Sequence, residues 1–206
     1  MQAMILYGRF HSPFVRRIAI WLNLQGRAFQ HEPIMVTGED FDRLKSINPV
    51  GRVPALQIDG GPLLIETAAI TDWIEDTAPV ETRLLPSTGT DRMEAMRTIA
   101  YANSLAEKAV ALVYDTIRRP EQLHWQDWIA RLSGQCRGAL DLLEASAPQS
   151  GFFGGQNPAG ADTAAVASYD FMKRTHPKVL TGPYARLEAL SQRANQLPAF
   201  ASAIPD

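Results

Sequence analysis

The chain has 206 residues, of which 46% are hydrophobic and 20% charged, with a formal net charge of −2. This composition is typical of a globular protein with one large or two small domains, and the weak net charge argues against nucleic acid or an anionic membrane as the main partner. No apolar run is long enough to cross a bilayer, and no basic, apolar leader precedes the first predicted strand. Cys136 is the only cysteine, and no Cys/His cluster has metal-ligand spacing. We therefore expect a cytoplasmic protein without a metal.

The chain begins with a predicted strand that leads directly into a helix. The apolar run at residues 4–7 predicts the strand. Ser12 followed by Pro13 predicts a helix start, because serine is a favoured N-cap and proline is preset for the first helical turn. Apolar residues then recur at helical spacing over residues 13–23, and Gly26 stands where such a helix ends. Ser12 is thus expected beside free N–H groups and partial positive charge, where an anion is stabilised.

Three further strands and a second helix are predicted before residue 78. The strands are residues 29–36, 55–58 and 63–65, and the helix is residues 67–76. Pro33 indicates that the first of these strands lies at an edge or ends early. Asp59-Gly60-Gly61 is a hairpin signal between the other two. Residues 1–78 are therefore predicted to form an α+β domain with a mixed four-stranded sheet and covering helices.

The rest of the chain has no strand pattern. Prolines and a Ser-Thr-Gly tract predict a linker at 79–90, and residues 91–206 are predicted to form an all-helical bundle. Its predicted helices are 91–117, 121–145, one that begins near Asp162, and shorter ones over 184–195. One side of the second helix carries an apolar stripe that we expect in the core: Trp125, Trp128, Leu132, Cys136, Ala139 and Leu143.

Four segments, taken in this order, resemble motifs of the cytosolic glutathione transferases. They are Ser12-Pro13-Phe14-Val15-Arg16-Arg17, Asn48 to Leu56 (NPVGRVPAL), Glu66-Thr67-Ala68-Ala69-Ile70, and Gly160-Ala161-Asp162 with the helix behind it. No single segment is specific to the family. Their order and spacing, together with the change from mixed to helical structure, make the resemblance specific. The resemblance runs from about residue 4 to about residue 203 and is to serine-type members. It implies a thioredoxin-like N-terminal domain followed by a helical domain.

The resemblance implies that Ser12 donates a hydrogen bond to the thiolate of bound glutathione. A free thiol with a pKa near ~8.5 is only a few per cent ionised at neutral pH, and the thiolate is the nucleophile. A lowering of the pKa by about two units needs roughly 2.7 kcal/mol of preference for the charged form, which a hydroxyl and a helix N-terminus can supply. A serine hydrolase would need a base and an orienting group, and no G-x-S-x-G elbow is present. Because Ser12 and Val15 stand where a redox relative has cysteines, dithiol chemistry is excluded.

The remaining glutathione contacts follow from the same resemblance. The Val53-Pro54 bond is expected to be cis, with the Val53 backbone pairing with the cysteinyl backbone of the peptide. Glu66 would bind the γ-glutamyl amino group, and Thr67 with the helix N-terminus its carboxylate. Arg52 is either a ligand of the glycyl carboxylate or a solvated surface charge. Arg17 and Asp162 are expected to have structural roles, with Asp162 as a buried cap and Ala159 in place of the usual hydroxyl cap.

The second substrate is expected to be a small apolar electrophile. Its pocket would be lined by Arg9, Phe10 and His11, with weaker candidates on the first bundle helix and just after it: Tyr101, Leu105, Lys108, Ala109 and Tyr114. The function implied is that of a homodimeric glutathione S-transferase. Two alternatives stay open: a glutathione-dependent isomerase or dehalogenase, and a non-catalytic ligand-binding protein on the same scaffold.

Overall fold

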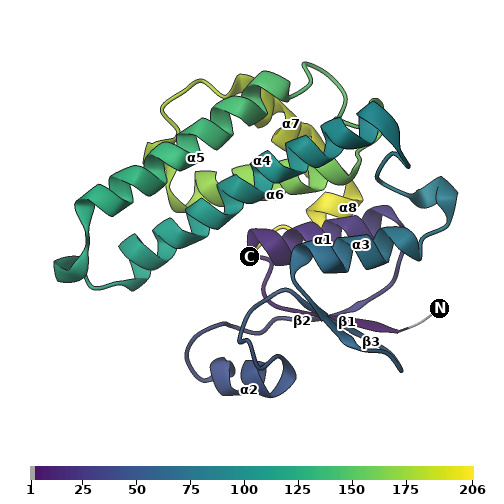
Figure 1. Ribbon diagram of the computed structural model, residues 1–206, viewed down its shortest axis with the longest axis horizontal. Helices are drawn as coiled ribbons and strands as arrows, with labels where there is room; N and C mark the ends of the chain where they lie inside the picture. Colours follow the sequence, from purple (N-terminus) through teal and green to yellow (C-terminus); the bar gives the residue numbers. More distant parts are fainter. Residues whose placement is uncertain (1–2) are drawn as a thin grey trace. The chain divides into compact units, whose positions relative to one another are not determined.

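The computed structural model describes residues 3–206, which form two compact units. The first unit runs to Leu85 and also includes Asn195–Asp206, and the second is Pro86–Ala194. Figure 1 gives the elements of both units, and each unit is described by itself below.

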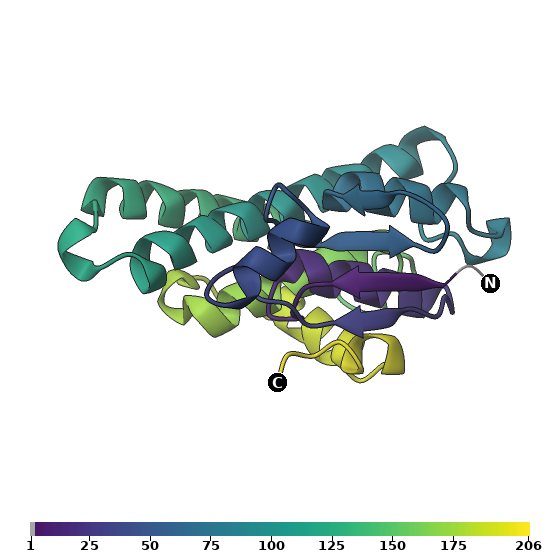
Figure 2. The same ribbon diagram turned by 90° about the horizontal axis from the view of Figure 1, so that it is seen from below.

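The first unit contains a mixed four-stranded sheet in the order β2-β1-β3-β4. Its strands are β1 (Met4–Tyr7), β2 (Gln30–Glu32), β3 (Ala55–Ile58) and β4 (Leu63–Ile65). β1 runs parallel to β2 and antiparallel to β3, so Leu6 lies opposite His31 on one side and Leu56 on the other (Figure 2). The predicted mixed four-stranded sheet is confirmed.

Helices α1 (Pro13–Leu24) and α3 (Thr67–Asp76) pack side by side on one face of this sheet. The helices and the sheet bury apolar side chains between them. Six of these side chains have no exposed surface: Leu6, Ile18, Trp21, Leu56, Ile70 and Ile74. Helix α2 (Asp40–Ile47) lies in the connection from β2 to β3. The sequence analysis did not predict α2, a helix of only 8 residues in which Leu44 is the one buried residue.

A buried carboxylate joins α1, α3 and the chain that follows them. Glu75 of α3 accepts hydrogen bonds from Trp21 Nε1 of α1 at 2.9 Å and from Nε2 of Gln25, the C-cap of α1, at 2.7 Å. The backbone N–H groups of Leu84 and Leu85 also donate to it, each at 3.1 Å. Since a buried carboxylate is stable only when its oxygens are hydrogen-bonded, these donors explain why Glu75 is tolerated in the core.

The last twelve residues belong to the first unit, whereas the sequence assigned all of 91–206 to the helical domain. The short helix α8 (Pro198–Ala201) lies beside α1 and buries Phe200 completely. Asn23 Nδ2 of α1 donates to the Ala199 carbonyl at 3.1 Å and to Ser202 Oγ at 3.0 Å. These contacts span about 176 residues of chain, so no local sequence pattern marks them.

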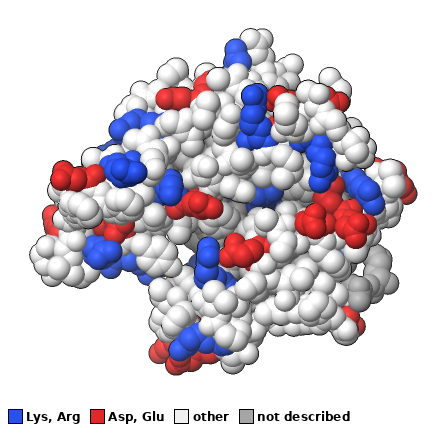
Figure 3. Space-filling model, in the orientation of Figure 1, with Lys and Arg blue, Asp and Glu red and all other residues white. Residues whose placement is uncertain are grey.

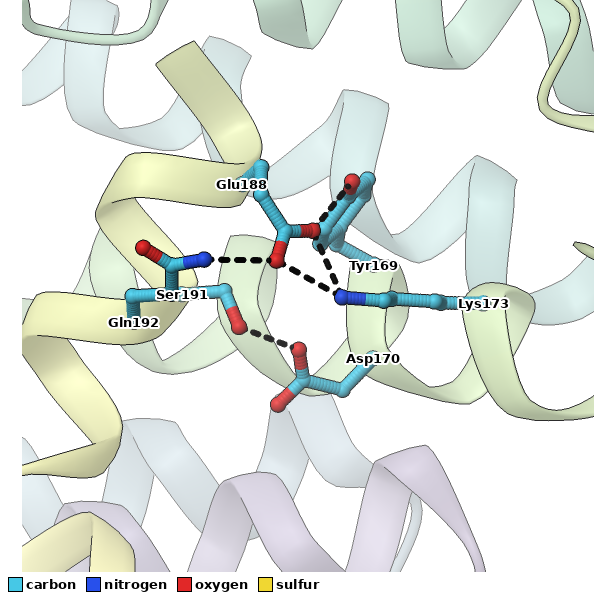
Figure 4. Close-up of polar contacts among 6 residues, drawn as sticks. All are labelled: Tyr169, Asp170, Lys173, Glu188, Ser191 and Gln192. Carbon is cyan, nitrogen blue, oxygen red and sulfur yellow. Dashed lines mark hydrogen bonds and ion pairs between the residues drawn. The ribbon is translucent and has the colours of Figure 1, made fainter. Parts of the chain in front are cut away.

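The second unit is helical. It contains α4 (Gly89–Val113), a π-helical turn η2 (Tyr114–Arg118), the 3-10 turns η3 (Glu121–Leu123) and η4 (Pro177–Val179), α5 (Gln126–Ser146), α6 (Gly160–Thr175) and most of α7 (Ala185–Asn195). Helix α4 packs against both α5 and α6. A polar cluster joins α6 to α7 (Figure 4). In it Glu188 accepts hydrogen bonds from Tyr169, Lys173 and Gln192 at 2.7–3.0 Å.

The prediction that both tryptophans of the apolar stripe lie in the core is wrong. Trp125 is 66% exposed and Trp128 is 38% exposed. Helix α5 begins only at Gln126, so Trp125 precedes it. Trp128 Nε1 donates to Asp115 Oδ2 at 3.0 Å, and the two indole rings stack with centroids 6.3 Å apart. The other four members of the stripe, Leu132, Cys136, Ala139 and Leu143, are buried as predicted.

On the face shown in Figure 3, acidic and basic side chains are interspersed. Over residues 3–206, no helix combines the length and apolar character needed to cross a membrane. Over the same residues, no group of three or more His, Cys, Asp or Glu is arranged to hold a metal ion.

Candidate functional site

Ser12 lies at the N-cap of α1, as the sequence predicted. Its Oγ accepts a long hydrogen bond from the Val15 N–H at 3.4 Å, and its own N–H donates to the Arg9 carbonyl at 3.0 Å. A serine hydroxyl has one donor and two acceptor positions. The cap uses an acceptor position, so the O–H remains available to donate away from the helix. Ser12 is half-buried, which leaves this donor within reach of a ligand.

Three segments leave or enter the sheet at the same end of its strands, next to Ser12. Tyr7, Ala55 and Ile65 lie opposite one another in the register of β1, β3 and β4. The chain therefore continues from this row into Gly8 on one strand and Glu66 on another, while Pro54 enters it on the third. Strand pairing alone brings the turn before α1, the loop before β3 and the start of α3 together.

Gly8 is the point where two of these segments touch. It has a φ of 121°, and a Cβ built on it would lie 2.6 Å from Val15 Cγ2 and 2.9 Å from Val53 Cβ. Real Cβ atoms do not approach other atoms this closely, so only glycine fits between α1 and the loop. The sequence analysis missed Gly8, although a glycine directly after an apolar strand is the signal that could have found it.

The loop before β3 is held by Asn48, which is buried at 1% exposure. Asn48 Nδ2 donates to the Arg52 carbonyl at 2.8 Å, and its Oδ1 accepts from the Val50 N–H at 3.1 Å. The Val53-Pro54 peptide bond is cis, as the resemblance implied. Among residues 3–206, the Val53 N–H and C=O have no hydrogen-bond partner, and Val53 is half-buried. Asn48 belongs to the loop motif found in the sequence, but its role in anchoring the loop was not predicted.

Glu66 and Thr67 lie at the N-terminus of α3. Glu66 is the N-cap and has a φ of 68° and a ψ of 128°, a conformation that non-glycine residues rarely adopt. No side chain caps this helix, and Thr67 is its first, nearly buried residue. Glu66 Oε1 pairs with Arg52 Nη1 at 2.9 Å, and both side chains are more than half exposed. The site therefore offers unpaired helical N–H groups, a carboxylate and a guanidinium within a small region.

The predicted electrophile residues are divided between the two units. Phe10 and His11 belong to the turn before Ser12, and both are half-buried. Tyr101, Leu105 and Lys108 lie on α4 in the second unit. Leu105 has no exposed surface, which is typical of a core residue and gives no support to ligand contact. Tyr101 and Lys108 keep partial exposure and are two helical turns apart, on one face of α4.

Asp162 has the buried capping role that the resemblance implied. Its Oδ2 accepts from the Ala159 N–H at 2.8 Å and its Oδ1 from the Phe153 N–H at 3.0 Å. Ala159 is the N-cap of α6 and has no side-chain acceptor, whereas Asp162 at the third helical position accepts from the N-cap N–H, as the acidic residue of a capping box does. Burial raises the pKa of the Asp162 carboxyl to about 6, against the opposing effect of the backbone hydrogen bonds. The residue is structural.

Comparison with known proteins agrees with this architecture. Residues 6–83 match the family model described as "Glutathione S-transferase, N-terminal domain". The fold is similar to that of a glutathione S-transferase from Methylobacterium radiotolerans solved in complex with glutathione sulfonate, with a TM-score of 0.88 and 22% identity over 98% of this chain and 95% of that one. A sheet of this order, followed by a helical unit and carrying these edge loops, defines a thioredoxin-like domain joined to a transferase-type helical domain.

Some known proteins are similar to this chain over nearly its whole length. A maleylacetoacetate isomerase from Pseudomonas aeruginosa is 28% identical over 98% of this chain and 96% of its own length. A maleylpyruvate isomerase from Ralstonia sp. is 26% identical over 98% and 97%. A solved maleylpyruvate isomerase, described as a zeta-class bacterial glutathione S-transferase, has a TM-score of 0.77 and 26% identity over 98% of this chain and 96% of that one. Residues 6–83 thus match the N-terminal domain of glutathione S-transferases, and over nearly its whole length the chain is similar to members of that family.

Proposed function

We propose that this protein binds glutathione at the edge of the sheet and stabilises its thiolate with the Ser12 hydroxyl. The observation that carries the proposal is the meeting of three ligand-ready groups at one edge. These groups are the Ser12 O–H at the start of α1, the Val53 N–H and C=O, and the uncapped start of α3 at Glu66 and Thr67. Each group matches one part of a γ-glutamyl peptide with a thiol.

The contacts of the peptide follow from the chemistry of each group. The uncapped N–H groups of α3 and the Thr67 hydroxyl suit the γ-glutamyl carboxylate, because a helix N-terminus stabilises anions. Glu66 suits the neighbouring ammonium. The Val53 N–H and C=O pair with the cysteinyl backbone as an added strand would. Arg52, already within ion-pair distance of Glu66, suits the glycyl carboxylate.

The strained backbone of Glu66 supports a functional role for this corner. A residue held in a rare conformation costs roughly 1–3 kcal/mol and persists where the surrounding structure fixes it, often at ligand sites. The Glu66 side chain is 58% exposed, so its own packing contributes little to offset this cost. We infer that the conformation is retained because it aims the carboxylate and the first N–H groups of α3 at the ligand.

For the reaction, we propose glutathione-dependent cis–trans isomerisation of a small unsaturated dicarboxylate of the maleyl type. The isomerase names of the near-full-length relatives favour this reaction over conjugation. In such a reaction the thiolate adds to the activated double bond, the resulting single bond rotates, and elimination of the thiolate restores the double bond as trans. Glutathione is regenerated, so it acts as a cofactor and not as a consumed substrate. This thiolate chemistry calls for no metal.

Conjugation of a small hydrophobic electrophile is the second candidate. It shares the first step with isomerisation, and Phe10 beside Ser12 would suit a planar apolar group. Phe10, His11, Tyr101 and Lys108 remain the proposed contacts of either second substrate. We also propose a cytoplasmic location, because a thiol cofactor and a single cysteine suit a reducing compartment.

Thiol counting during turnover separates these functions. The protein is given glutathione with either maleylpyruvate or an aryl halide, and both product formation and remaining free thiol are measured. Isomerisation should convert many equivalents of maleylpyruvate with no loss of thiol, whereas conjugation should consume one thiol per product. Binding of glutathione by calorimetry without turnover of either compound would point to a ligand-binding protein. Absence of glutathione binding would overturn the proposal.

A further inference from the structure

The side chain of His31 in β2 contacts two residues of the turn that carries Ser12. His31 Nε2 lies 2.7 Å from the carbonyl oxygen of Gly8, and its ring stacks on the ring of Phe10 with centroids 3.9 Å apart and planes 4° apart. A carbonyl only accepts, so Nε2 carries the proton and donates. One imidazole therefore fixes both ends of the three-residue stretch from Gly8 to Phe10.

The position of His31 follows from the way the parallel ladder ends. β2 stops at Glu32, directly before Pro33, and the last backbone bond of the ladder is from the Gly8 N–H to the Glu32 carbonyl at 2.9 Å. The Gly8 carbonyl then has no backbone donor from β2, and the His31 side chain supplies one instead. Gly8 is thus held through both its N–H and its C=O.

This contact bears directly on the orientation of the Ser12 hydroxyl. The chain between the fixed residue Phe10 and the N-cap contains only His11, and the Ser12 N–H is itself bonded back to Arg9. A shift of the Gly8–Phe10 stretch must therefore move Ser12 relative to α1 and to Val53. Misplacement of a catalytic group by even about 1 Å can cost a large factor in rate.

We propose that His31 is a positioning residue for the Ser12 hydroxyl. It touches neither glutathione nor the reacting atoms, and it acts by holding the Gly8 carbonyl and the Phe10 ring. The inference rests on the proposed role of Ser12 toward the glutathione thiolate.

The first experiment separates the hydrogen bond from the stack. His31→Phe keeps a flat ring and removes the donor, His31→Gln keeps an N–H donor and removes the ring, and Phe10→Leu removes the stack from the other side. The readout is the pKa of enzyme-bound glutathione, measured from thiolate absorbance against pH. We expect His31→Phe to raise this pKa by about half a unit to one unit, with a three- to tenfold loss of turnover at neutral pH and less than a twofold change in glutathione affinity at low pH.

The matched control is His124→Phe. His124 Nε2 also lies within hydrogen-bond distance of a backbone carbonyl, that of Arg119 at 3.0 Å, but in the second unit. Its replacement removes the same kind of bond away from Ser12 and should leave the bound-thiol pKa unchanged. His31→Gln and Phe10→Leu keep the question answerable if His31→Phe does not fold.

A double variant shows whether His31 acts through Ser12. In a Ser12→Ala background, His31→Phe should produce no further rise of the thiol pKa, because the donor that it positions is already gone. Additive shifts would overturn the positioning role, as would unchanged titrations in all three single variants. If wild-type protein failed to bind glutathione, or bound it with an unshifted thiol, the proposed function itself would fall and the inference with it. The two failures are therefore distinguishable in one data set.

Discussion

At Ser12, one hydroxyl serves both the helix and the proposed ligand. Its oxygen accepts from the Val15 N–H, and its proton is left to donate. This division explains how the same residue can be a plain N-cap and a thiolate donor, two roles that the sequence could not separate.

Replacing Ser12 by alanine should raise the pKa of enzyme-bound glutathione by roughly one to two units, because a donor to the charged form is lost. Turnover at neutral pH should fall in step with the loss of thiolate, roughly tenfold for each pKa unit. The affinity for glutathione at low pH should change little. Stability should also drop by about 1 kcal/mol through loss of the cap. The pKa is measured from thiolate absorbance. Ser146→Ala, which removes an exposed hydroxyl at the end of α5, is the control. An unshifted titration with turnover intact would assign the donor role elsewhere.

Glu66 allows charge and backbone strain to be tested separately. Glu66→Gln keeps the side-chain shape and the strained conformation but removes the charge, so glutathione binding should weaken by roughly 1.5–3 kcal/mol with stability unchanged. Glu66→Gly should weaken binding at least as much yet raise stability by about 1 kcal/mol, since glycine adopts a φ of 68° without strain. Calorimetry and urea unfolding measure the two quantities. The exposed ion pair with Arg52 contributes too little to mask either effect. Equal stability of the glycine and glutamine variants would contradict the strain.

Among the elements, the close approach of β1, α1 and the cis-proline loop depends on Gly8. Gly8→Ala should lower the free energy of unfolding by at least about 2 kcal/mol, because it adds both an unfavourable φ and a clash with Val15 and Val53. Gly26→Ala is the matched control: Gly26 also has a positive φ, of 65°, but has open space around it. The difference between the two variants in denaturant unfolding measures the clash together with the greater strain of a φ of 121°, and equal losses would mean that the segments do not touch there.

Helix α6 depends on a buried carboxyl whose pKa is raised, and this fixes the sign of a pH effect. Asp162 has a pKa of about 6 in the fold against a reference of 3.8, so the folded state holds the extra proton between these values. Stability from this group is therefore present below about pH 4 and is lost as pH rises through about 6, by about 3 kcal/mol in total. Asp162→Asn should flatten stability against pH in this window. Asp127→Asn, at an exposed position in the first turn of α5, is the control. A wild-type curve that rises from pH 4 to 6, unaltered by Asp162→Asn, would contradict the assignment.

At the scale of the whole molecule, the family resemblance predicts a two-fold dimer. Light scattering at micromolar concentration should give a mass of about twice 22.7 kDa. Methionines 93 and 96, at the start of α4, are 56% and 45% exposed and are candidates for burial in such an interface. Met93→Lys together with Met96→Lys should then favour the monomer without unfolding it. A wild-type mass near 22.7 kDa would contradict the dimer.

The sequence by itself determined the features that depend on neighbouring residues. The Ser12-Pro13 helix start, the Asp59-Gly60-Gly61 hairpin and the change from strands to helices are each encoded within a few positions, and the structure has all three. A local signal also marked Ser12 as a helix cap, whereas the roles of Val53, Pro54, Glu66 and Thr67 were predicted from the family resemblance of their segments. The early end of β2 was likewise visible in Pro33.

Only the tertiary structure decided what depends on distant partners. It places β1 in the middle of the sheet, returns the last twelve residues to α1, exposes Trp125 and Trp128, and sets His31 against Gly8 and Phe10. Periodicity shows that a face is apolar but not which element covers it, and a strand's neighbours are fixed by pairing across the fold. Gly8 illustrates the difference: its sequence neighbours permit many residues there, whereas Val15 and Val53, brought close by the fold, leave room for none but glycine.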